Sequence, residues 1–233
     1  MKKLSLTILM ILTMLLAACG NDDNGQEEAA QQPQEPEPVE FSEDEFVDSD
    51  TSVVVVNGEE LQGNDYNTAY SLVKSMMHQA GQDVTDLEAL QDETISFLVE
   101  QELVMQEAND QGVEVTDEEV QEEMDALKEQ GGEEQFQTSL EQLNLSEEQF
   151  AQQLRYNLAT MHYMEKAFDI EVTEEEVQDM YDELSAQMEG QEMQDLDEIR
   201  DQLEQMVEQN KQQEAYADKI DELRKSAEVE ELL

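Results

Sequence analysis

The stretch VTDEEVQEEMDALKEQGG, residues 115–132, contains the signals for the start, the buried side and the end of one helix. Thr116 precedes Glu119 by three residues, the spacing of a capping box in which each side chain bonds the other residue's free backbone N–H. The apolar residues then repeat at steps of four and three: Val120, Met124 and Leu127. Gly131 and Gly132 follow them, and glycine is common just past a helix end. The stretch therefore predicts an amphipathic helix.

The same start signal occurs at three more places, in VTDLEA from residue 84, LSEEQF from 145 and VTEEEV from 172. In each, a Ser or Thr precedes a Glu or Gln by three positions: Thr85 with Glu88, Ser146 with Gln149, and Thr173 with Glu176. The boxes are unequally spaced along the chain, so we interpret them as shared capping chemistry and not as a repeat protein.

Apolar periodicity predicts seven helices in all. The helical steps cover these ranges: 66–77, 87–109, 120–127, 136–140, 150–161, 177–188 and 195–223. A seam of alternating steps of three and four follows the last and longest of them: Leu196, Ile199, Leu203, Met206, Asn210, Gln213, Ala217 and Ile220. The polar Asn210 and Gln213 in this seam favour packing along the body over a free coiled coil, which stays the alternative.

Short strands are predicted at both ends of the helical body. VVVVNGEEL, residues 53–61, combines β-branched residues with the turn signal Asn57-Gly58. SAEVEELL, residues 226–233, is a second segment that can pair with residues 53–56. The predicted fold is therefore mainly α: a multi-helix module with a long C-terminal helix and one short two-stranded pairing of the body's ends.

The charge of the chain excludes one class of partner. The sequence has 61 acidic and 11 basic residues, for a formal net charge of −50. We expect no nucleic acid partner, because binding nucleic acid requires Lys and Arg to displace its counterions. So acidic a chain also suggests a saline or alkaline exterior, where charge preserves solubility.

Residues 1–18 have the layout of a bacterial signal peptide. Lys2 and Lys3 precede an apolar run that is shorter than the roughly 20 residues of a spanning helix. LAACG, residues 16–20, resembles a bacterial lipobox, whose cysteine is lipidated and becomes the first residue after cleavage. Cys19 is the only cysteine, so it has no partner for an internal disulfide. We expect a lipid anchor on Cys19; a plain signal peptide with an incidental cysteine is the alternative.

Residues 19–50 are predicted to form the lipidated cysteine and an acidic tether, and residues 51–233 the folded domain. Residues 21–50 contain all three prolines and no Lys or Arg. Such a segment buries too little apolar surface to offset its ordering entropy, so we expect it to be disordered. Phe41 and Phe46 are the exceptions, which dock transiently on the body or on nothing.

Signals for catalysis or for a bound cofactor are missing from the sequence. His78 and His162 each lie in a helical run, far from any Cys or second His that would join them on a metal. The sequence has no Gly-rich phosphate loop, no G-x-S-x-G and no Cys–His pair. We therefore expect no metal, no cofactor and no enzymatic activity.

Methionine is the residue type that points to binding. Ten of the 13 methionines follow the signal peptide, and most lie on helical apolar stripes, where filling a core is their ordinary role. Methionine also lines adaptable binding surfaces. We rank four residues as candidates for contact with a polypeptide: Met180, Tyr181, Met188 and Met206.

Four stretches occur in a characteristic order along the chain. They are VVVVNGEEL (53–61), LQDETISFLVEQELVMQEANDQGVEVTDEEV (90–120), LSEEQFAQQLRYNLATMHYMEKAFDIEVTEEEVQDMY (145–181) and LDEIRDQLEQMVEQNKQQEAYADKIDELRKSAEVEELL (196–233). Together they resemble the SurA/PrsA group of exported foldases. The resemblance implies a SurA N-terminal-like chaperone module, in which N-terminal helices and a returning C-terminal helix bind unfolded exported chains. A lipobox is what Gram-positive members of this group carry.

The chain departs from the isomerase members of that group at one place. Those members insert a parvulin domain of roughly a hundred residues before the last helix, and residues 182–195 are too few to fold such a domain. No residue here matches the parvulin site. The resemblance therefore implies a chaperone module without peptidyl-prolyl isomerase activity.

The expected function is that of a membrane-anchored chaperone on the extracytoplasmic face of a Gram-positive-like bacterium, which binds unfolded secreted polypeptides. One alternative is a dedicated adaptor lipoprotein that binds a single wall or secretion protein. Another is a residual peptidyl-prolyl isomerase-type enzyme. A homodimer stays open, because the last helix offers a long seam.

Overall fold

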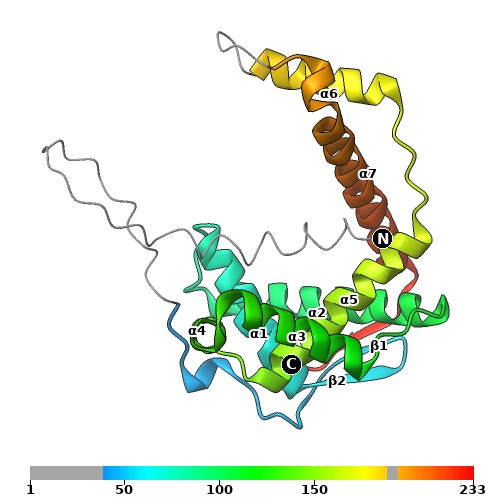
Figure 1. Ribbon diagram of the computed structural model, residues 1–233. Helices are drawn as coiled ribbons and strands as arrows, with labels where there is room; N and C mark the ends of the chain where they lie inside the picture. The colour runs from blue at the N-terminus through cyan, green and yellow to red at the C-terminus, as the bar shows by residue number, and fades with distance from the viewer. Residues whose placement is uncertain (1–38, 188–193) are drawn as a thin grey trace, which may run out of the picture. The chain divides into compact units, whose positions relative to one another are not determined.

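The computed structural model describes residues 39–187 and 194–233, and this part of the chain is mainly α, as predicted (Figure 1). The strands are β1 (Ser52–Val56), β2 (Glu59–Gln62) and β3 (Val229–Glu231). The helices are α1 (Gly63–Gln79), α2 (Leu87–Asp110), α3 (Asp117–Gly131), α4 (Glu133–Gln142), α5 (Glu147–Ala167), α6 (Glu174–Gln187) and α7 (Leu196–Ser226). Within the described ranges, none of these helices combines the length and the apolar character needed to cross a membrane.

The three strands form an antiparallel sheet in the order β2-β1-β3. Asn57 and Gly58 make the turn between β1 and β2 with φ of 54° and 90°, and a two-residue hairpin turn of this kind requires positive φ at both positions. Val229 of β3 lies opposite Val56 of β1. The two ends of the body therefore pair as predicted, with β1 in the centre of the sheet.

Two larger apolar clusters, with a smaller third one around Ala108, Val113 and Tyr163, hold the body together. The first joins β1, α1 and α2, and its buried members are Val53, Val54, Val56, Tyr66, Ala69, Tyr70, Val73, Leu90, Ile95, Leu98, Val99 and Leu103. The second joins α3, α4 and α5, and its buried members are Val120, Met124, Phe136, Leu140, Leu145 and Leu154. In the second cluster the rings of Phe136 and Phe150 meet edge to face, with centroids 5.5 Å apart.

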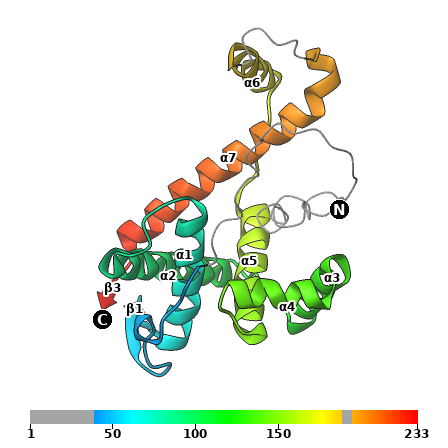
Figure 2. The same ribbon diagram turned by 90° about the vertical axis from the view of Figure 1, so that its left-hand side faces the viewer.

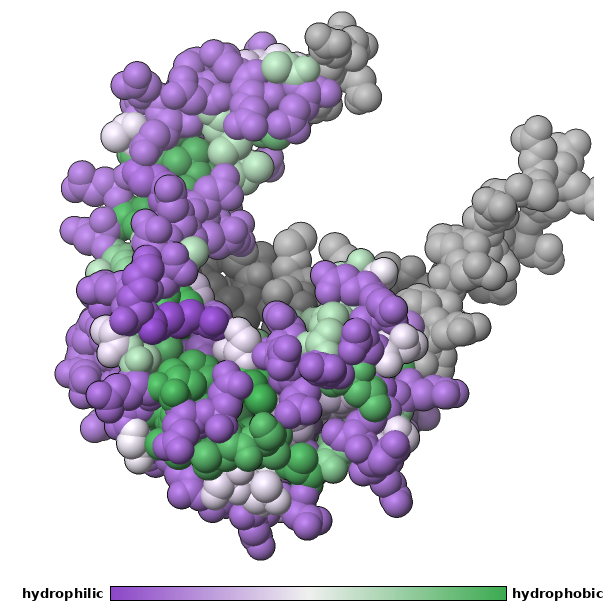
Figure 3. All heavy atoms as spheres, turned by 180° about the vertical axis from the view of Figure 1, so that it is seen from behind, coloured by the Kyte–Doolittle hydropathy of each residue, from purple (hydrophilic) through white to green (hydrophobic). Residues whose placement is uncertain are grey.

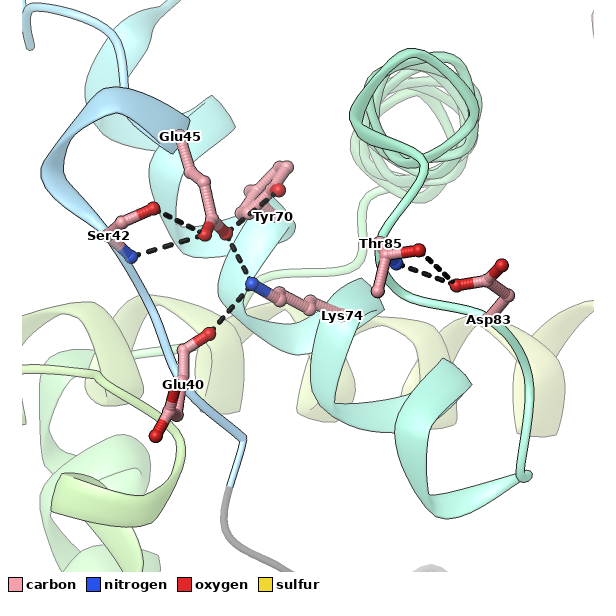
Figure 4. A network of polar contacts seen from close by, with 7 residues as sticks. All are labelled: Glu40, Ser42, Glu45, Tyr70, Lys74, Asp83 and Thr85. Atoms are coloured by element: carbon pink, nitrogen blue, oxygen red, sulfur yellow. Dashed lines mark hydrogen bonds and ion pairs between the residues drawn. The ribbon is translucent and has the colours of Figure 1, made fainter.

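Residues 39–50 pack against α1, although we expected them to belong to a disordered tether. Phe46 packs on the first cluster, and its ring meets that of Tyr70 edge to face with centroids 5.7 Å apart. The Lys74 ammonium donates to the Glu45 carboxylate at 2.5 Å and to the Glu40 carbonyl at 2.7 Å (Figure 4). The folded part therefore begins before residue 51. The composition of residues 39–50 did not predict this packing, because Lys74, which binds the segment, lies outside it on α1.

Three of the four predicted capping boxes are present: Thr116 with Glu119, Ser146 with Gln149, and Thr173 with Glu176. The box at Thr85 is wrong. Asp86 caps α2, because its carboxylate accepts from the Ala89 N–H at 3.2 Å. The Thr85 hydroxyl instead donates to the Asp83 carboxylate at 2.7 Å (Figure 4). A charged carboxylate is the stronger acceptor for the helix N–H, and Thr85 already has a partner.

The buried side of α7 also differs from the predicted seam. Leu203, Val207 and Ile220 are buried. Four seam residues are instead exposed: Met206, Asn210, Gln213 and Ala217. Because α7 packs against both α6 and α2, its buried side changes along its length, and one constant three-four seam does not describe it.

Candidate functional site

The contact candidates described by the structure lie on one pair of helices. Met180 and Tyr181 are half-buried on α6, and Met206 is 39% exposed on α7. The two helices pack against each other, and the Tyr181 hydroxyl donates to the Gln194 carbonyl just before α7 at 3.1 Å. Met188 and Cys19 lie outside the described residues. Met206 is thus the candidate whose side chain is most available to a partner.

Salt bridges fix α6 to α7. The Lys211 ammonium of α7 bonds both the Glu176 carboxylate and the Glu171 carbonyl at 2.6 Å. The bond from Lys211, with those from Thr173, lowers the pKa of Glu176 to about 2. Arg200 of α7 pairs with Glu174 at the start of α6.

Further along α7, basic residues fix it to α2. Lys219 pairs with Glu107 at 3.3 Å. Burial lowers the pKa of Lys219, but the bond and the charge of Glu107, together with Tyr163 and Glu222, outweigh this and the pKa is raised overall. The Arg224 guanidinium donates to the Ser96 carbonyl at 3.0 Å and to the Glu100 carboxylate at 3.2 Å.

These pairs follow a rule that covers the whole described part of the chain: each Lys or Arg there bonds a carboxylate or a backbone carbonyl. Lys225 pairs within its own helix, with Asp221. The others join two segments of the fold: Lys74, Lys128, Arg155, Lys166, Arg200, Lys211, Lys219 and Arg224. The few Lys and Arg side chains thus form contacts within the protein itself. The remaining carboxylates give the surface a strongly negative charge.

Large apolar side chains are exposed at a few places on this acidic surface: Met76, Leu87, Met206, Val229, Leu232 and Leu233. The view in Figure 3 shows hydrophobic patches separated by hydrophilic residues. Half of these exposed residues lie in the last five positions, on β3 and just after it. We had predicted pairing of this segment but not its exposure, and the apolar residues among the glutamates of EVEELL were the available signal.

In the part of the chain that the structure describes, no three His, Cys, Asp or Glu side chains gather as metal ligands would. The hydroxyls of Tyr156 on α5 and Tyr216 on α7 lie 3.4 Å apart, and burial raises the pKa of both. Both tyrosines are therefore neutral at ordinary pH and lie where α5 contacts α7. We interpret the pair as part of the packing between these helices and not as a catalytic pair.

The helical module with its sheet of joined ends corresponds to a known domain family. The SurA-like N-terminal domain family matches residues 39–164, which is more than half of the chain. The chain therefore belongs to this family. The match includes residues 39–50, the N-terminal segment that packs against α1.

Two relatives agree with this assignment. Over 153 residues, the chain is 29% identical to the foldase protein PrsA of Caldanaerobacter subterraneus subsp. tengcongensis, a match that covers 61% of this chain and 45% of that protein. The chain thus spans less than half the length of this curated relative. A solved structure of SurA-like chaperones from Campylobacter jejuni, described as the virulence factor PEB4 and the periplasmic protein Cj1289, superposes with a TM-score of 0.51. That match has 12% identity and covers 78% of this chain and 99% of the other, so it shows the shared fold.

Proposed function

We propose that this protein is a lipid-anchored, extracytoplasmic chaperone that binds unfolded secreted polypeptides and has no peptidyl-prolyl isomerase activity. The observation that carries the proposal is the family match over residues 39–164, which includes β1, β2 and α1 to α5. The names of the foldase and of the SurA-like chaperones support a chaperone role, and the periplasmic description of one of them supports a place outside the cytoplasm.

The connection between α6 and α7 supports the absence of an isomerase domain. Gln187 ends α6 and Leu196 begins α7, so eight residues, 188–195, connect the two helices. A folded domain needs several tens of residues to bury a core, roughly 40 or more. We therefore expect no turnover of a proline-containing peptide.

The mechanism is a reversible contact between apolar side chains of the client and exposed apolar residues such as Met206. The surrounding carboxylates keep the complex soluble and favour basic clients over acidic ones. Flexible methionine side chains adapt to many sequences, which suits a chaperone better than an adaptor for one partner.

An aggregation assay with two clients of one fold and opposite charge tests this function. The full chain would be held in phosphatidylcholine nanodiscs, with empty nanodiscs as the blank, and light scattering would follow the reduction of lysozyme (basic) and of α-lactalbumin (acidic). We expect suppression of both at stoichiometric ratio, and stronger suppression for lysozyme. Suppression of neither would overturn the chaperone proposal, and crosslinking on cells to one protein alone would then establish the adaptor.

The lipid anchor is tested at Cys19. In cells fed an alkyne fatty acid, the wild-type protein should carry the label and sediment with membranes. Cys19→Ser should lose the label and most of the membrane association, because the thiol that carries the lipid is gone. A Cys19→Ser protein that stays in the membrane fraction to the same extent would show that the anchor lies elsewhere.

A further inference from the structure

Strand β3 forms one edge of the sheet, beside the central β1 (Figure 2). Two bonds fix its register. The Asn57 N–H donates to the Glu228 carbonyl at 2.8 Å, and the Leu232 N–H donates to the Val53 carbonyl at 2.9 Å. Between them, Val229 lies opposite Val56 and Glu231 opposite Val54.

This register decides which backbone groups of β3 are free. In an antiparallel pair, the residues that bond the neighbouring strand alternate with residues that point their N–H and C=O away from it. Glu228 and Leu232 bond towards β1, so Val229 and Glu231 direct their donors and acceptors outward. Within the described residues no further strand pairs with β3.

The side chains around this edge give it a mixed character. Val229, Leu232 and Leu233 are 43%, 44% and 43% exposed. Three exposed glutamates alternate with or adjoin them: Glu228, Glu230 and Glu231. The edge thus combines free backbone groups, apolar side chains and negative charge within six residues.

We propose that the outer edge of β3 binds an extended, basic and apolar segment of an unfolded polypeptide as a fourth strand. The proposal rests on the proposed chaperone function and names where and how a client binds. Main-chain hydrogen bonds provide affinity without requiring one sequence, and alternate side chains meet the exposed valine and leucines.

The negative charge of β3 favours a basic client segment over a second copy of this chain or an acidic client. A second copy of the chain would place its own β3 glutamates opposite these, and like charges directly opposite on neighbouring strands destabilise a pairing. An acidic client would meet the same repulsion. A segment that alternates apolar residues with Lys or Arg puts opposite charges at these positions, where they stabilise the added strand.

The test uses fluorescence anisotropy with a labelled peptide of alternating Val and Lys, and the full chain in phosphatidylcholine nanodiscs. Val229→Pro removes an N–H that makes no bond to β1, so it blocks the outer edge without breaking the existing ladder. We expect binding to weaken about tenfold or more, the scale of one lost hydrogen bond with added steric block. The matched control Val229→Thr keeps the N–H and the β-branched shape, and should bind within about threefold of wild type.

A peptide of alternating Val and Glu should not bind, and nor should the Val–Lys peptide with every backbone amide N-methylated. Circular dichroism should give Val229→Pro the wild-type unfolding temperature. If that variant is unfolded, Glu231→Pro, which removes the other outward N–H, and the N-methylated peptide decide the question. Retained binding by the methylated peptide would overturn the proposal.

The possible outcomes distinguish the proposed client site on β3 from the proposed chaperone function. If wild type suppresses client aggregation while the proline variants bind the Val–Lys peptide as tightly as wild type, the edge is not the client site and the chaperone function stands. If wild type neither suppresses aggregation nor binds the peptide, both proposals fall. A dimer in sedimentation that Val229→Pro dissolves would assign the edge to a second copy and overturn the proposal.

Discussion

Lys74 is the residue that ties the N-terminal segment to the helical body. Its side chain is 6% exposed and that of Glu45 is 8% exposed, so the two charges form a buried pair. Burial raises the pKa of Glu45, but the bonds from Lys74, Ser42 and Tyr70 outweigh it and hold the pKa below the ordinary 4.5. The ammonium also lies over the Phe41 ring, 5.2 Å from its centroid. One lysine therefore gathers the segment's charge, carbonyl and aromatic groups.

Lys74→Met should release residues 39–50 from α1. Removing one partner of a buried pair typically costs about 3–5 kcal/mol, because the other charge stays buried without compensation. The segment can detach as a unit, so the loss should appear as local opening more than as global unfolding. Hydrogen exchange at residues 41–47 should become fast, and Lys74→Met with Glu45→Gln should recover part of the protection. The control is Lys225→Met, whose pair with Asp221 is exposed and should matter little.

The pair of Lys74 and Glu45 also makes the packing of residues 39–50 depend on pH. A carboxyl with a lowered folded pKa adds stability above its unfolded pKa, and that stability is lost as the pH falls through the folded value. Protection of residues 41–47 should therefore persist at neutral pH and decline below about pH 4.5. In Glu45→Gln the decline over this range should be absent, and an unchanged decline would assign it to other carboxyls.

At the scale of single elements, helix starts were largely predictable and one was not. The boxes at Thr116, Ser146 and Thr173 use side chains three residues apart, so they depend on the local chain alone. At the start of α2, the adjacent residues Thr85 and Asp86 each have a side-chain oxygen that could accept a hydrogen bond from a free helix N–H. Asp83 takes the Thr85 hydroxyl and Asp86 takes the helix N–H, so the helix begins one residue later than the box predicts.

This competition predicts unequal effects for two adjacent substitutions. Asp86→Ala should destabilise the protein by about 1 kcal/mol, the usual cost of a lost N-cap. For a chain of this size that is a fall of about 2–4 °C in unfolding temperature. Thr85→Ala removes an exposed bond and should cost a few tenths of a kcal/mol, roughly within ±0.5 kcal/mol of neutral. The reverse order, measured by thermal unfolding of the two variants, would make Thr85 the cap.

At the scale of the whole molecule, charge dominates. The formal net charge is −50, and the described Lys and Arg residues already have partners. Repulsion among the remaining carboxylates opposes folding, while a limited set of short pairs favours it. Salt screens the long-range repulsion more than it screens close, partly buried pairs.

Salt should therefore stabilise this protein. The screening length falls from about 10 Å at 0.1 M to about 3 Å at 1 M salt. We expect the unfolding temperature to rise by at least about 5 °C over that range, or ~2 kcal/mol for a chain of this size. Sucrose at matched osmolality controls for general exclusion effects and should give a smaller rise. A fall with NaCl would mean that the attractive pairs outweigh the repulsion.

The sequence by itself determined the seven helices and the strands β1 and β3, because capping boxes, apolar steps and β-branched runs act over a few neighbouring residues; it predicted the Asn57-Gly58 turn but not β2 as a third strand of the sheet. It also determined the family, whose match covers residues 39–164. Only the tertiary structure decided which side of α7 is buried, that residues 39–50 are packed, and that the apolar residues of β3 lie at an open edge. These features depend on partners distant in the chain: Glu45 and Lys74 are 29 residues apart, and Ser96 and Arg224 are 128 apart. Local sequence patterns do not identify such partners, because the packing of the helices decides which charged residues and which helix faces come into contact.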